Sequence, residues 1–480
     1  MPAPGTSARG AAQRRFAQSR GGELDPACHS LLHKWASRGS TRAEPLLPAC
    51  PDECGWWEPP SLAPGASSSL LRCLVAKKAA RPNRAVPGGV KLAWFMSLTA
   101  PQPNTSLTER KNVDAARVAI VSALLHAPTL VPHVLYMRPA GSPSRNDSFS
   151  SFCEQLGVRV IFHELTFERD VQANMVGSSG FLKTGPTTIN IGTYGRMDLF
   201  TLVPQLSRSE GWAERRMSPD AVLYTDTDVI FSGDVSFDQL RGALLGTPGL
   251  PPLAIMNSTM NTWTAQQRVP PDGGLVHTLA AGTEVFAGEM NAGVMLINIT
   301  AMAQEWPHML AYAKARRFHF VLNDQTWVTE WLLPMYHPKL VPDQWTPLKH
   351  RVGWQQLDDA IFNARAFAHP KRPTDGLAVR APRLWHWHGY KAHHVACWLE
   401  HLGKPSCNRT TPMLPRRTLR AATGGKCTHL ATFLYRLDRC ALHTYAYLLR
   451  EHQALLELAD TVADPPITLD ASQLVGVMMS

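Results

Sequence analysis

A short apolar run broken by two carboxylates, Val222–Phe231, constrains the fold of this chain more than any other segment. Its β-branched and apolar residues predict a buried strand, and Asp226 and Asp228 follow at the point where that strand ends. In an open α/β sheet, side chains at the carboxyl ends of strands point into the crevice where ligands bind. Two neighbouring carboxylates repel each other there, and a divalent cation is the usual compensation. The alternative, a solvated turn after a strand, stays open because Asp-x-Asp also arises by chance.

Strands and helices alternate along the middle of the chain. Apolar runs of strand length occur at 92–96, 134–137, 158–162, 222–231, 253–256, 293–297 and 383–388. Helical spacing of apolar residues occurs at 113–125, 149–156, 194–206, 300–316 and 324–333. This alternation predicts an α/β fold with a mixed, mostly parallel, Rossmann-like sheet and helices on both faces.

Composition divides the chain into three regions. Residues 1–90 are rich in Pro, Gly, Ala, Ser and Arg without sustained periodicity, which predicts a largely irregular segment. Residues 91–398 hold the α/β pattern, and 399–480 form a cysteine-containing extension with helices expected at 430–442 and 445–458. The net charge of +10 comes largely from the first region, where 12 Lys and Arg face 6 Asp and Glu. A nearly neutral middle argues against a nucleic-acid enzyme, which would carry a basic stripe on its folded domain.

Cysteines and glycosylation sequons bear on the compartment. Eight of the nine cysteines lie before residue 91 or after residue 396, which suits disulfides in an oxidising compartment, although reduced thiols remain an alternative. Five Asn-x-Ser/Thr sequons add a hint of secretory passage, at Asn104, Asn146, Asn257, Asn298 and Asn408. We therefore expect the secretory pathway or Golgi lumen. The Arg-rich, acid-free start resembles a transit peptide, so a plastid or cytoplasmic location is the alternative.

No membrane span is expected, because prolines and histidines interrupt the most apolar long stretch, Ala116–Tyr136.

Four polar and glycine-containing segments occur in an informative order: 193–198 (Thr-Tyr-Gly-Arg-Met-Asp), 226–228 (Asp-Thr-Asp), 291–293 (Asn-Ala-Gly) followed by Asp324-Gln325, and 386–391 (His-Trp-His-Gly-Tyr-Lys). This order resembles the retaining nucleotide-sugar glycosyltransferases of the glycogenin, galactinol synthase and galacturonosyltransferase group. The resemblance covers roughly residues 91–398 and implies the GT-A fold.

The resemblance implies a metal site and a diphosphate site. Asp226 and Asp228 would hold Mn²⁺, with Mg²⁺ possible, and His386 would complete the protein ligands because Mn²⁺ tolerates an imidazole. His388 is the competing ligand, and a hydrogen-bonded core histidine is the structural alternative. Lys391 would contact the diphosphate of a UDP-sugar beside Gly389, Thr225 and Thr227. The family usually continues Lys-Pro-Trp, whereas this chain reads Lys391-Ala-His-His.

The resemblance also implies a donor-sugar pocket. Asn291, Ala292 and Gly293 would line it, although a tight turn suits them equally. Gln325 would steady oxocarbenium charge on the reactive face, because a neutral amide is a poor covalent nucleophile, and Asp324 would bind sugar hydroxyls or cap a helix. The remaining donor contacts expected are Arg196 with the diphosphate or sugar, Asp198 with a sugar hydroxyl, and Ser97 and Thr99 with uridine. For Arg196 and Asp198 a surface ion pair is the alternative.

These expectations define a Mn²⁺-dependent hexosyltransferase that moves a sugar from a UDP-sugar to a carbohydrate or glycoconjugate acceptor with retention. Two alternatives stay open. One is an inverting GT-A transferase, which needs a general base on the acceptor side. The other is an inactive module of the same fold that binds sugar or nucleotide, because fold does not fix function. The sequence leaves the donor sugar, the acceptor and the oligomeric state undecided.

Overall fold

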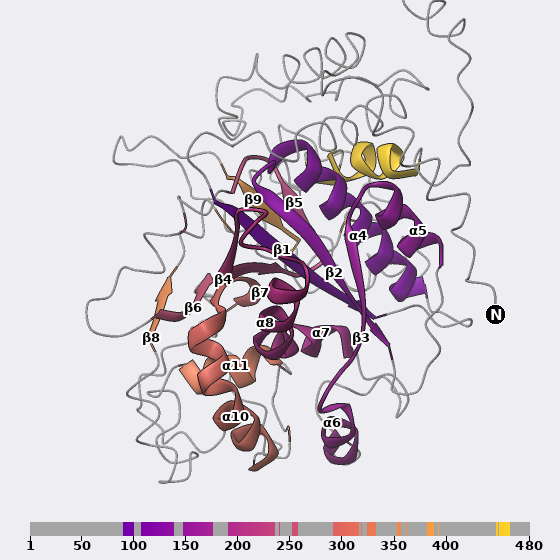
Figure 1. Ribbon diagram of the computed structural model, residues 1–480. Helices are drawn as coiled ribbons and strands as arrows, with labels where there is room; N and C mark the ends of the chain where they lie inside the picture. The colour runs from indigo at the N-terminus through magenta and orange to yellow at the C-terminus, as the bar shows by residue number, and fades with distance from the viewer. Residues whose placement is uncertain are drawn as a thin grey trace, which may run out of the picture.

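A computed structural model describes residues 90–99, 107–138, 147–175, 191–235, 240, 252–257, 291–315, 318, 324–332, 353–356, 362, 382–387, 392, 448–449 and 451–460. The described part is built around a mixed seven-stranded sheet in the order β3-β2-β1-β4-β7-β6-β8. The strands are β1 (Lys91–Thr99), β2 (Leu130–Arg138), β3 (Arg159–Glu164), β4 (Met217–Thr225), β6 (Pro252–Asn257), β7 (Asn291–Asn298) and β8 (Gly353–Gln356). Only β7 runs antiparallel to its neighbours in this sheet (Figure 1).

The predicted mixed, mostly parallel sheet with helices on both faces is confirmed. On one face lie α4 (Leu107–His126) and α5 (Ser148–Gln155). The other face carries α7 (Ile191–Tyr194), α8 (Leu199–Ser209), α10 (Ile299–Ala315) and α11 (Asp324–Leu332) (Figure 1). Parallel neighbours need such crossover helices, and these helices bury both faces of the sheet.

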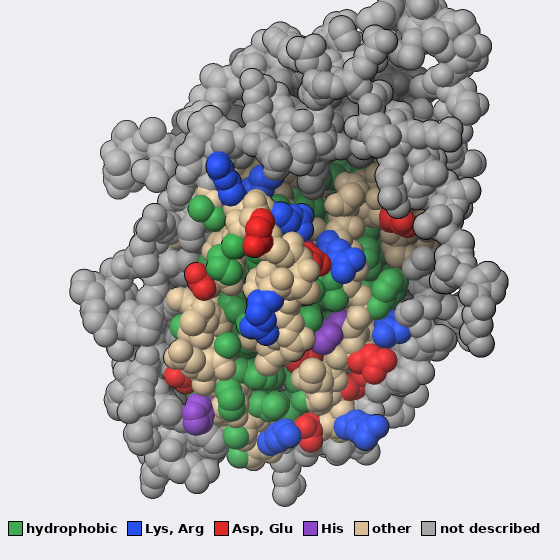
Figure 2. All heavy atoms as spheres, viewed as in Figure 1, with side chains coloured by type: hydrophobic (Ala, Val, Ile, Leu, Met, Phe, Trp, Pro, Cys, Tyr) green, Lys and Arg blue, Asp and Glu red, His purple; other side chains and the backbone are tan. Residues whose placement is uncertain are grey.

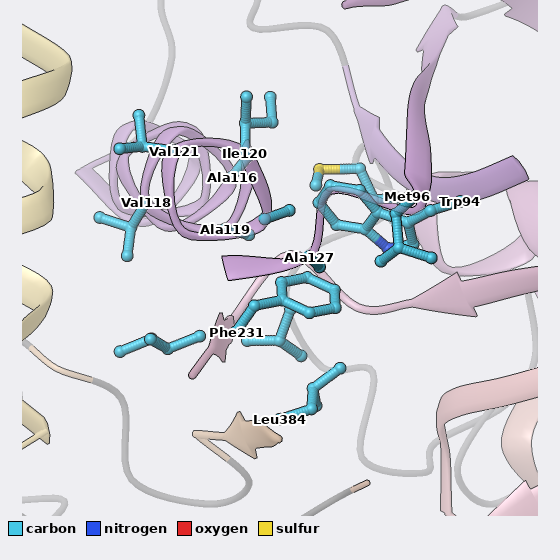
Figure 3. Close-up of a cluster of buried hydrophobic side chains, with 14 of the residues drawn as sticks. Trp94, Met96, Ala116, Val118, Ala119, Ile120, Val121, Ala127, Phe231 and Leu384 are labelled. Atoms are coloured by element: carbon cyan, nitrogen blue, oxygen red, sulfur yellow. The ribbon is translucent and has the colours of Figure 1, made fainter. Parts of the chain in front are cut away.

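Alternate residues of β1 supply the two halves of the core. Trp94 and Met96 point into the cluster beneath α4, whereas Ala93 and Phe95 point into the cluster beneath α8 and α10. Figure 3 shows the first cluster, with Phe231 between α4 and Leu384. A strand buried on both faces reads as a continuous apolar run, which explains why the sequence predicted β1 so directly.

A second, two-stranded sheet pairs β5 (Val229–Phe231) with β9 (Leu384–His386) in antiparallel register. It joins residues more than 150 positions apart in the sequence. β5 begins directly after the two aspartates, so this pairing fixes which later segment lies beside them. Phe231 also packs edge-on against Trp94, with ring centroids 4.8 Å apart, which ties the small sheet to the main core.

The predicted elements match the observed ones with four differences. The apolar run at 222–231 forms two strands, β4 and β5, which belong to different sheets and are separated by the two aspartates. The single helix expected at 194–206 is divided into α7, a 3₁₀ turn (Gly195–Asp198) and α8. The reason lies at Gly195, where a Cβ atom would come within 2.9 Å of both Met137 Sδ and Ser97 Cβ, so the turn packs directly on β1 and β2. Two short elements, α6 (Glu168–Met175) and β8, had no counterpart among the predicted segments.

Several expectations lie partly or wholly outside the described residues. They include the irregular 1–90 segment, the helix at 430–442 and eight of the nine cysteines. Cys153 is described; it is buried and forms no disulfide. Residues 448, 449 and 451–460 are helical, which agrees with the helix expected at 445–458. Within the described residues, no helix combines the length and hydropathy needed to cross a bilayer.

Acidic and basic side chains are interspersed over the described part of the face shown in Figure 2. Glu210 accepts hydrogen bonds from Arg159 Nε at 2.9 Å and Trp212 Nε1 at 3.3 Å. Its Oε2 also lies 3.8 Å from His133 Nε2. The interaction with His133, together with these hydrogen bonds, lowers the pKa of Glu210 to about 2.

We predict that Glu210→Gln lowers the free energy of unfolding by about 1 kcal/mol at neutral pH. A depressed pKa stabilises the folded state above the unfolded-state pKa, and this contribution disappears as the pH falls toward 2. Urea unfolding of both proteins should therefore show a difference at pH 7 that narrows below pH 4.5. A difference that stays constant down to pH 3 would contradict this assignment.

Candidate metal and donor site

β4 brings Asp226 to the carboxyl edge of the sheet by simple alternation. Val222 and Tyr224 point to the α8 side of the sheet, and Leu223 points to the α4 side. Thr225 is fully buried and accepts a hydrogen bond from Trp94 Nε1 at 2.9 Å. Asp226 follows as the first residue past the strand, with its side chain 33% exposed. A strand that ends here therefore presents a carboxylate at the edge where ligands bind in α/β sheets.

β7 approaches this carboxylate closely because residue 293 is glycine. The N–H of Asp226 donates to Gly293 O at 2.8 Å, which continues the antiparallel ladder one residue past β4. A Cβ atom on Gly293 would overlap His386 Cε1 and lie 2.8 Å from Asp226 Oδ2. Asn291 Oδ1 accepts the Gly293 N–H at 2.9 Å and so fixes the start of the strand. The Asn-Ala-Gly segment thus forms the wall behind the acidic pair.

The small β5–β9 sheet brings His386 to the same place. His386 is opposite Val229 in the ladder, and the N–H of Trp387 donates to Asp228 O at 2.9 Å. His386 Nε2 lies 3.5 Å from Asp228 Oδ1 and 3.9 Å from Asp226 Oδ2. The imidazole is 2% exposed, so it faces the aspartates and not solvent.

Asp226, Asp228 and His386 form a group that fits a divalent cation. Each offers one ligand atom, and these three atoms lie within 4.8 Å of one another. Two carboxylate oxygens and an imidazole nitrogen are a donor set that Mn²⁺ accepts. Because Gly293 has no side chain, His386 and Asp226 can lie close together beside it.

Arg196 joins the acidic pair to the neighbouring helix. Its Nη2 donates to Asp226 Oδ1 at 2.8 Å, and its Nη1 donates to the carbonyl of Ala292. Nε donates to Thr193 O at 3.0 Å and also lies 2.7 Å from Asp324 Oδ2. The guanidinium carbon stacks 4.6 Å above the Tyr224 ring. Only 4% of Arg196 is exposed, so it is a buried cation shared by two carboxylates.

These contacts decide the charges of the group. Burial lowers the pKa of Arg196, but Asp226 and Asp324 raise it more, so the guanidinium stays charged. Burial raises the pKa of Asp324 to about 7, against the opposing effect of Arg196 and with a further contribution from Asp226. Arg196 holds Oδ1 of Asp226, while Oδ2 faces His386. A charged partner on the second oxygen of a metal ligand fixes that ligand's orientation.

Gln325 is held against the same strand. Its Oε1 accepts the N–H of Ala292 at 3.2 Å, while the carbonyl of Ala292 accepts from Arg196. Asp324 begins α11 and is 3% exposed. The backbone N–H and C=O of Ala292 therefore connect Gln325 to Arg196, which in turn binds Asp226. Residues separated by about 130 positions in the sequence meet here within hydrogen-bond distance.

The remaining predicted site residues occupy other positions. Asp198 is fully buried, and its oxygens accept from Thr166 N at 2.8 Å and Thr166 Oγ1 at 2.7 Å, with His163 Nε2 at 2.8 Å. Ser97 Oγ donates to the carbonyl of Gly192. The Asp198 contacts attach the 3₁₀ turn to the end of β3, and the Ser97 contact attaches α7 to β1. The donor contacts expected of Asp198 and Ser97 stay predictions.

Two further predicted site residues, Thr99 and Thr227, belong to the described part of the chain. Thr99 Oγ1 accepts from Gly192 N at 3.0 Å, and Thr227 is half-buried in the turn between the aspartates. His388, Gly389 and Lys391 lie outside the described residues.

Sequence reasoning did not single out Tyr224 or Trp94. Tyr224 carries the guanidinium of Arg196 on its ring, and its hydroxyl lies 2.9 Å from Ser97 Oγ. The period-two alternation of β4 places Tyr224 on the same side as Asp226, and this was the signal that could have identified it. Trp94 had no such signal, because its bond to Thr225 depends on the register between β1 and β4.

Comparisons with known proteins show similarity to solved glycosyltransferase structures. An active-site mutant of LgtC aligns with a TM-score of 0.36 and 15% identity, over 69% of this chain and 95% of LgtC. The WbbM bifunctional glycosyltransferase gives 0.38 and 15%, over 63% of this chain and 47% of WbbM. Mouse xyloside xylosyltransferase 1 gives 0.30 and 18%, over 62% and 97%. No family model and no curated protein matches this chain. TM-scores this low carry no functional inference.

Proposed function

We propose that this protein is a Mn²⁺-dependent glycosyltransferase that moves a hexose from a UDP-sugar to a hydroxyl of a carbohydrate or glycoconjugate acceptor. The observation that carries the proposal is the convergence of Asp226, Asp228 and His386 at the carboxyl end of β4. A binding site for a small sugar alone does not need two carboxylates and an imidazole within 4.8 Å. Such a group suits a site for a nucleoside diphosphate, because the divalent cation that it can hold neutralises the phosphates.

The three ligands would hold the cation through Asp226 Oδ2, a carboxylate oxygen of Asp228 and His386 Nε2. When bound, the cation would act as a Lewis acid that stabilises charge on the departing diphosphate. Arg196 keeps Asp226 oriented for this role and adds positive charge behind the acidic pair. Lys391 is proposed as a further cation on the diphosphate, as the family resemblance implies.

We place Gln325 at the reactive face of the donor sugar. Its amide oxygen is already engaged by Ala292 N–H, which orients the side chain before any ligand arrives. A neutral amide is a weak nucleophile, which favours attack by the acceptor on the leaving-group side with Gln325 steadying positive charge. Asp324 is proposed to bind sugar hydroxyls beside it.

Retention is favoured over inversion by the surroundings of the acidic residues. An inverting enzyme needs a general base for the acceptor, commonly a carboxylate. Within the described site, Asp226 and Asp324 lie against Arg196, and Asp228 lies beside His386. Determining the anomeric configuration of the product by NMR tests this part of the proposal, and an inverted anomer would reject it.

Asp228→Asn tests the metal assignment, because it removes a charged ligand while keeping the side-chain size. We expect Mn²⁺-stimulated UDP release to fall at least about 100-fold, because Asp228 would hold the cation that stabilises the departing diphosphate. Asp220→Asn is the matched control: Asp220 is exposed on the same strand and, among the described residues, accepts a hydrogen bond from Thr300 Oγ1 at 3.1 Å. Full activity in Asp228→Asn would reject the metal assignment.

Gln325→Ala should lower kcat about 10-fold to 100-fold with little change in the donor KM, because the lost contact acts in the transition state. The matched control is Gln205→Ala, at an exposed position of α8. Steady-state kinetics with the best UDP-sugar measure both constants. Unchanged turnover in Gln325→Ala would remove this residue from the mechanism.

The secretory location is likewise proposed, on the sequons and the cysteine distribution. One sequon residue has a structural role: Asn298 Oδ1 accepts the N–H of Ala301 at 3.0 Å and caps α10. Treatment of protein from secretory cells with an endoglycosidase tests the proposal, and no change in mass would count against it.

A further inference from the structure

The helical residues 448, 449 and 451–460, which we call the C-terminal helix, belong to the same core as the strands beside the proposed metal site. Its buried side chains join the cluster beneath α4: Leu448, Leu449, Leu455, Leu458 and Ala459. Asp460 pairs with Arg117 Nη1 of α4 at 2.8 Å. In Figure 3, Val118 and Val121 lie on the side of α4 that faces this helix, whereas Ala119 lies on the side of Phe231. α4 is therefore packed between the C-terminal helix and β5.

A direct contact links this helix to the ligand-bearing strand. The ring of His452 meets that of Trp387 nearly edge-on, with centroids 6.1 Å apart and an angle of 82°. Trp387 is 2% exposed, follows the ligand His386 in sequence, and donates its N–H to the carbonyl of the ligand Asp228. Trp387 thus touches both strands of the small sheet, and His452 packs against its ring.

The small sheet needs such support from outside. β5 and β9 have three residues each, and an isolated pair of strands this short has little stability of its own. From the α4 side, Ser122 Oγ accepts the N–H of Phe231 at 3.0 Å. At the other end, the ring of His452 packs against Trp387.

We propose that the C-terminal helix braces the metal site: His452 packs on Trp387 and thereby fixes Asp228 and His386 at the separation that a cation requires. Trp387 and His452 are then positioning residues, because neither touches the cation. This inference rests on the metal site of the proposed function. Ligand geometry depends on the groups that support the ligands, and loss of such groups weakens metal binding.

The ring of His452 acts by packing against the ring of Trp387. Its Nδ1 is buried and makes no hydrogen bond among the described residues, and burial lowers the pKa of His452 to about 4, so the ring is neutral at pH 7. A phenylalanine could therefore replace it. His452→Phe should retain Mn²⁺ affinity, whereas His452→Ala should weaken it roughly 3-fold to 10-fold, at the lower end of effects seen for residues behind metal ligands.

The experiment measures Mn²⁺ affinity of the full chain by isothermal titration calorimetry, beside the melting temperature of each variant. Leu458→Ala is the control, because it also empties a buried position of the helix but lies about two turns from residue 452. The inference predicts weaker Mn²⁺ binding in His452→Ala, near wild-type binding in His452→Phe, and wild-type binding in Leu458→Ala despite a lower melting temperature.

Two results would overturn the inference: wild-type Mn²⁺ affinity in His452→Ala, or equal losses of affinity in His452→Ala and Leu458→Ala. If His452→Ala does not fold, His452→Leu replaces it under the same criteria. Asp228→Asn separates this inference from the proposed function. If the wild type binds Mn²⁺ no better than Asp228→Asn, the metal site itself is rejected. If Asp228→Asn loses Mn²⁺ binding but His452→Ala binds Mn²⁺ as well as wild type, only the bracing role of His452 is rejected.

Discussion

Gly293→Ala should abolish Mn²⁺ binding while leaving most of the fold intact. The added methyl would overlap His386 Cε1 and press on Asp226 Oδ2 at 2.8 Å, so two of the three metal ligands must move apart. Flanking β-strand hydrogen bonds prevent Gly293 itself from retreating. We expect an affinity loss of at least about 100-fold, with about 1–3 kcal/mol of destabilisation from the crowded contact. Calorimetry with Mn²⁺ and thermal unfolding measure the two effects.

Gly157→Ala separates the collision from the general effect of replacing a glycine. Gly157 has a φ of +66°, and a Cβ there would meet no atom within 4 Å. Its replacement should cost about 1 kcal/mol for the left-handed backbone and leave Mn²⁺ affinity unchanged. If Gly293→Ala binds Mn²⁺ as well as Gly157→Ala does, then Asp226 and His386 do not hold the cation together.

Arg196→Met should destabilise the protein by about 3–5 kcal/mol, because it leaves Asp226 and the buried Asp324 without their shared cation. It should also weaken Mn²⁺ binding, since Oδ1 of Asp226 loses the donor that orients it. Arg196→Lys should recover part of the stability and little of the affinity. A lysine keeps the charge but cannot reach Asp226 and the Ala292 carbonyl through one rigid fork.

Arg208→Met provides the control for this prediction. Arg208 is exposed on α8, so its replacement removes the same charge without creating an unpaired buried carboxylate. Urea unfolding at pH 7 gives the comparison. Equal free energies of unfolding for Arg196→Met and Arg208→Met would mean that Arg196 is not the counter-ion of the acidic group.

Much of the fold followed from patterns that are local in sequence. β1, β7 and the second half of β4 (221–225) are buried on both faces, so each is a largely apolar run, and their adjacency in the sheet brings Asp226 and Gly293 together. The motif at 386–388 identified His386 as a ligand candidate, and the β5–β9 register places it beside both aspartates. Strand identity and motif chemistry are therefore readable from the sequence alone.

Structural features that depend on strand register or on packing between distant segments could not be predicted from the sequence. The bridge from Arg196 to Asp226 and Asp324 joins three elements, and no local pattern distinguishes it from a surface ion pair. The division of the helix at 194–206 depends on the close approach of Gly195 to β1 and β2. The packing of His452 on Trp387 links residues 65 positions apart that no motif relates.

The most direct test of the central claim is UDP release by the full chain from a panel of UDP-sugars, measured first with Mn²⁺ and then with EDTA. A transferase hydrolyses its own donor slowly in the absence of acceptor, so no acceptor needs to be known. The account predicts release from one donor in preference to the others, dependent on Mn²⁺ and lost in Asp228→Asn. Binding of UDP by the folded protein without release from any donor, with or without Mn²⁺ and with a range of sugar acceptors added, would contradict it and favour a binding module of the same fold.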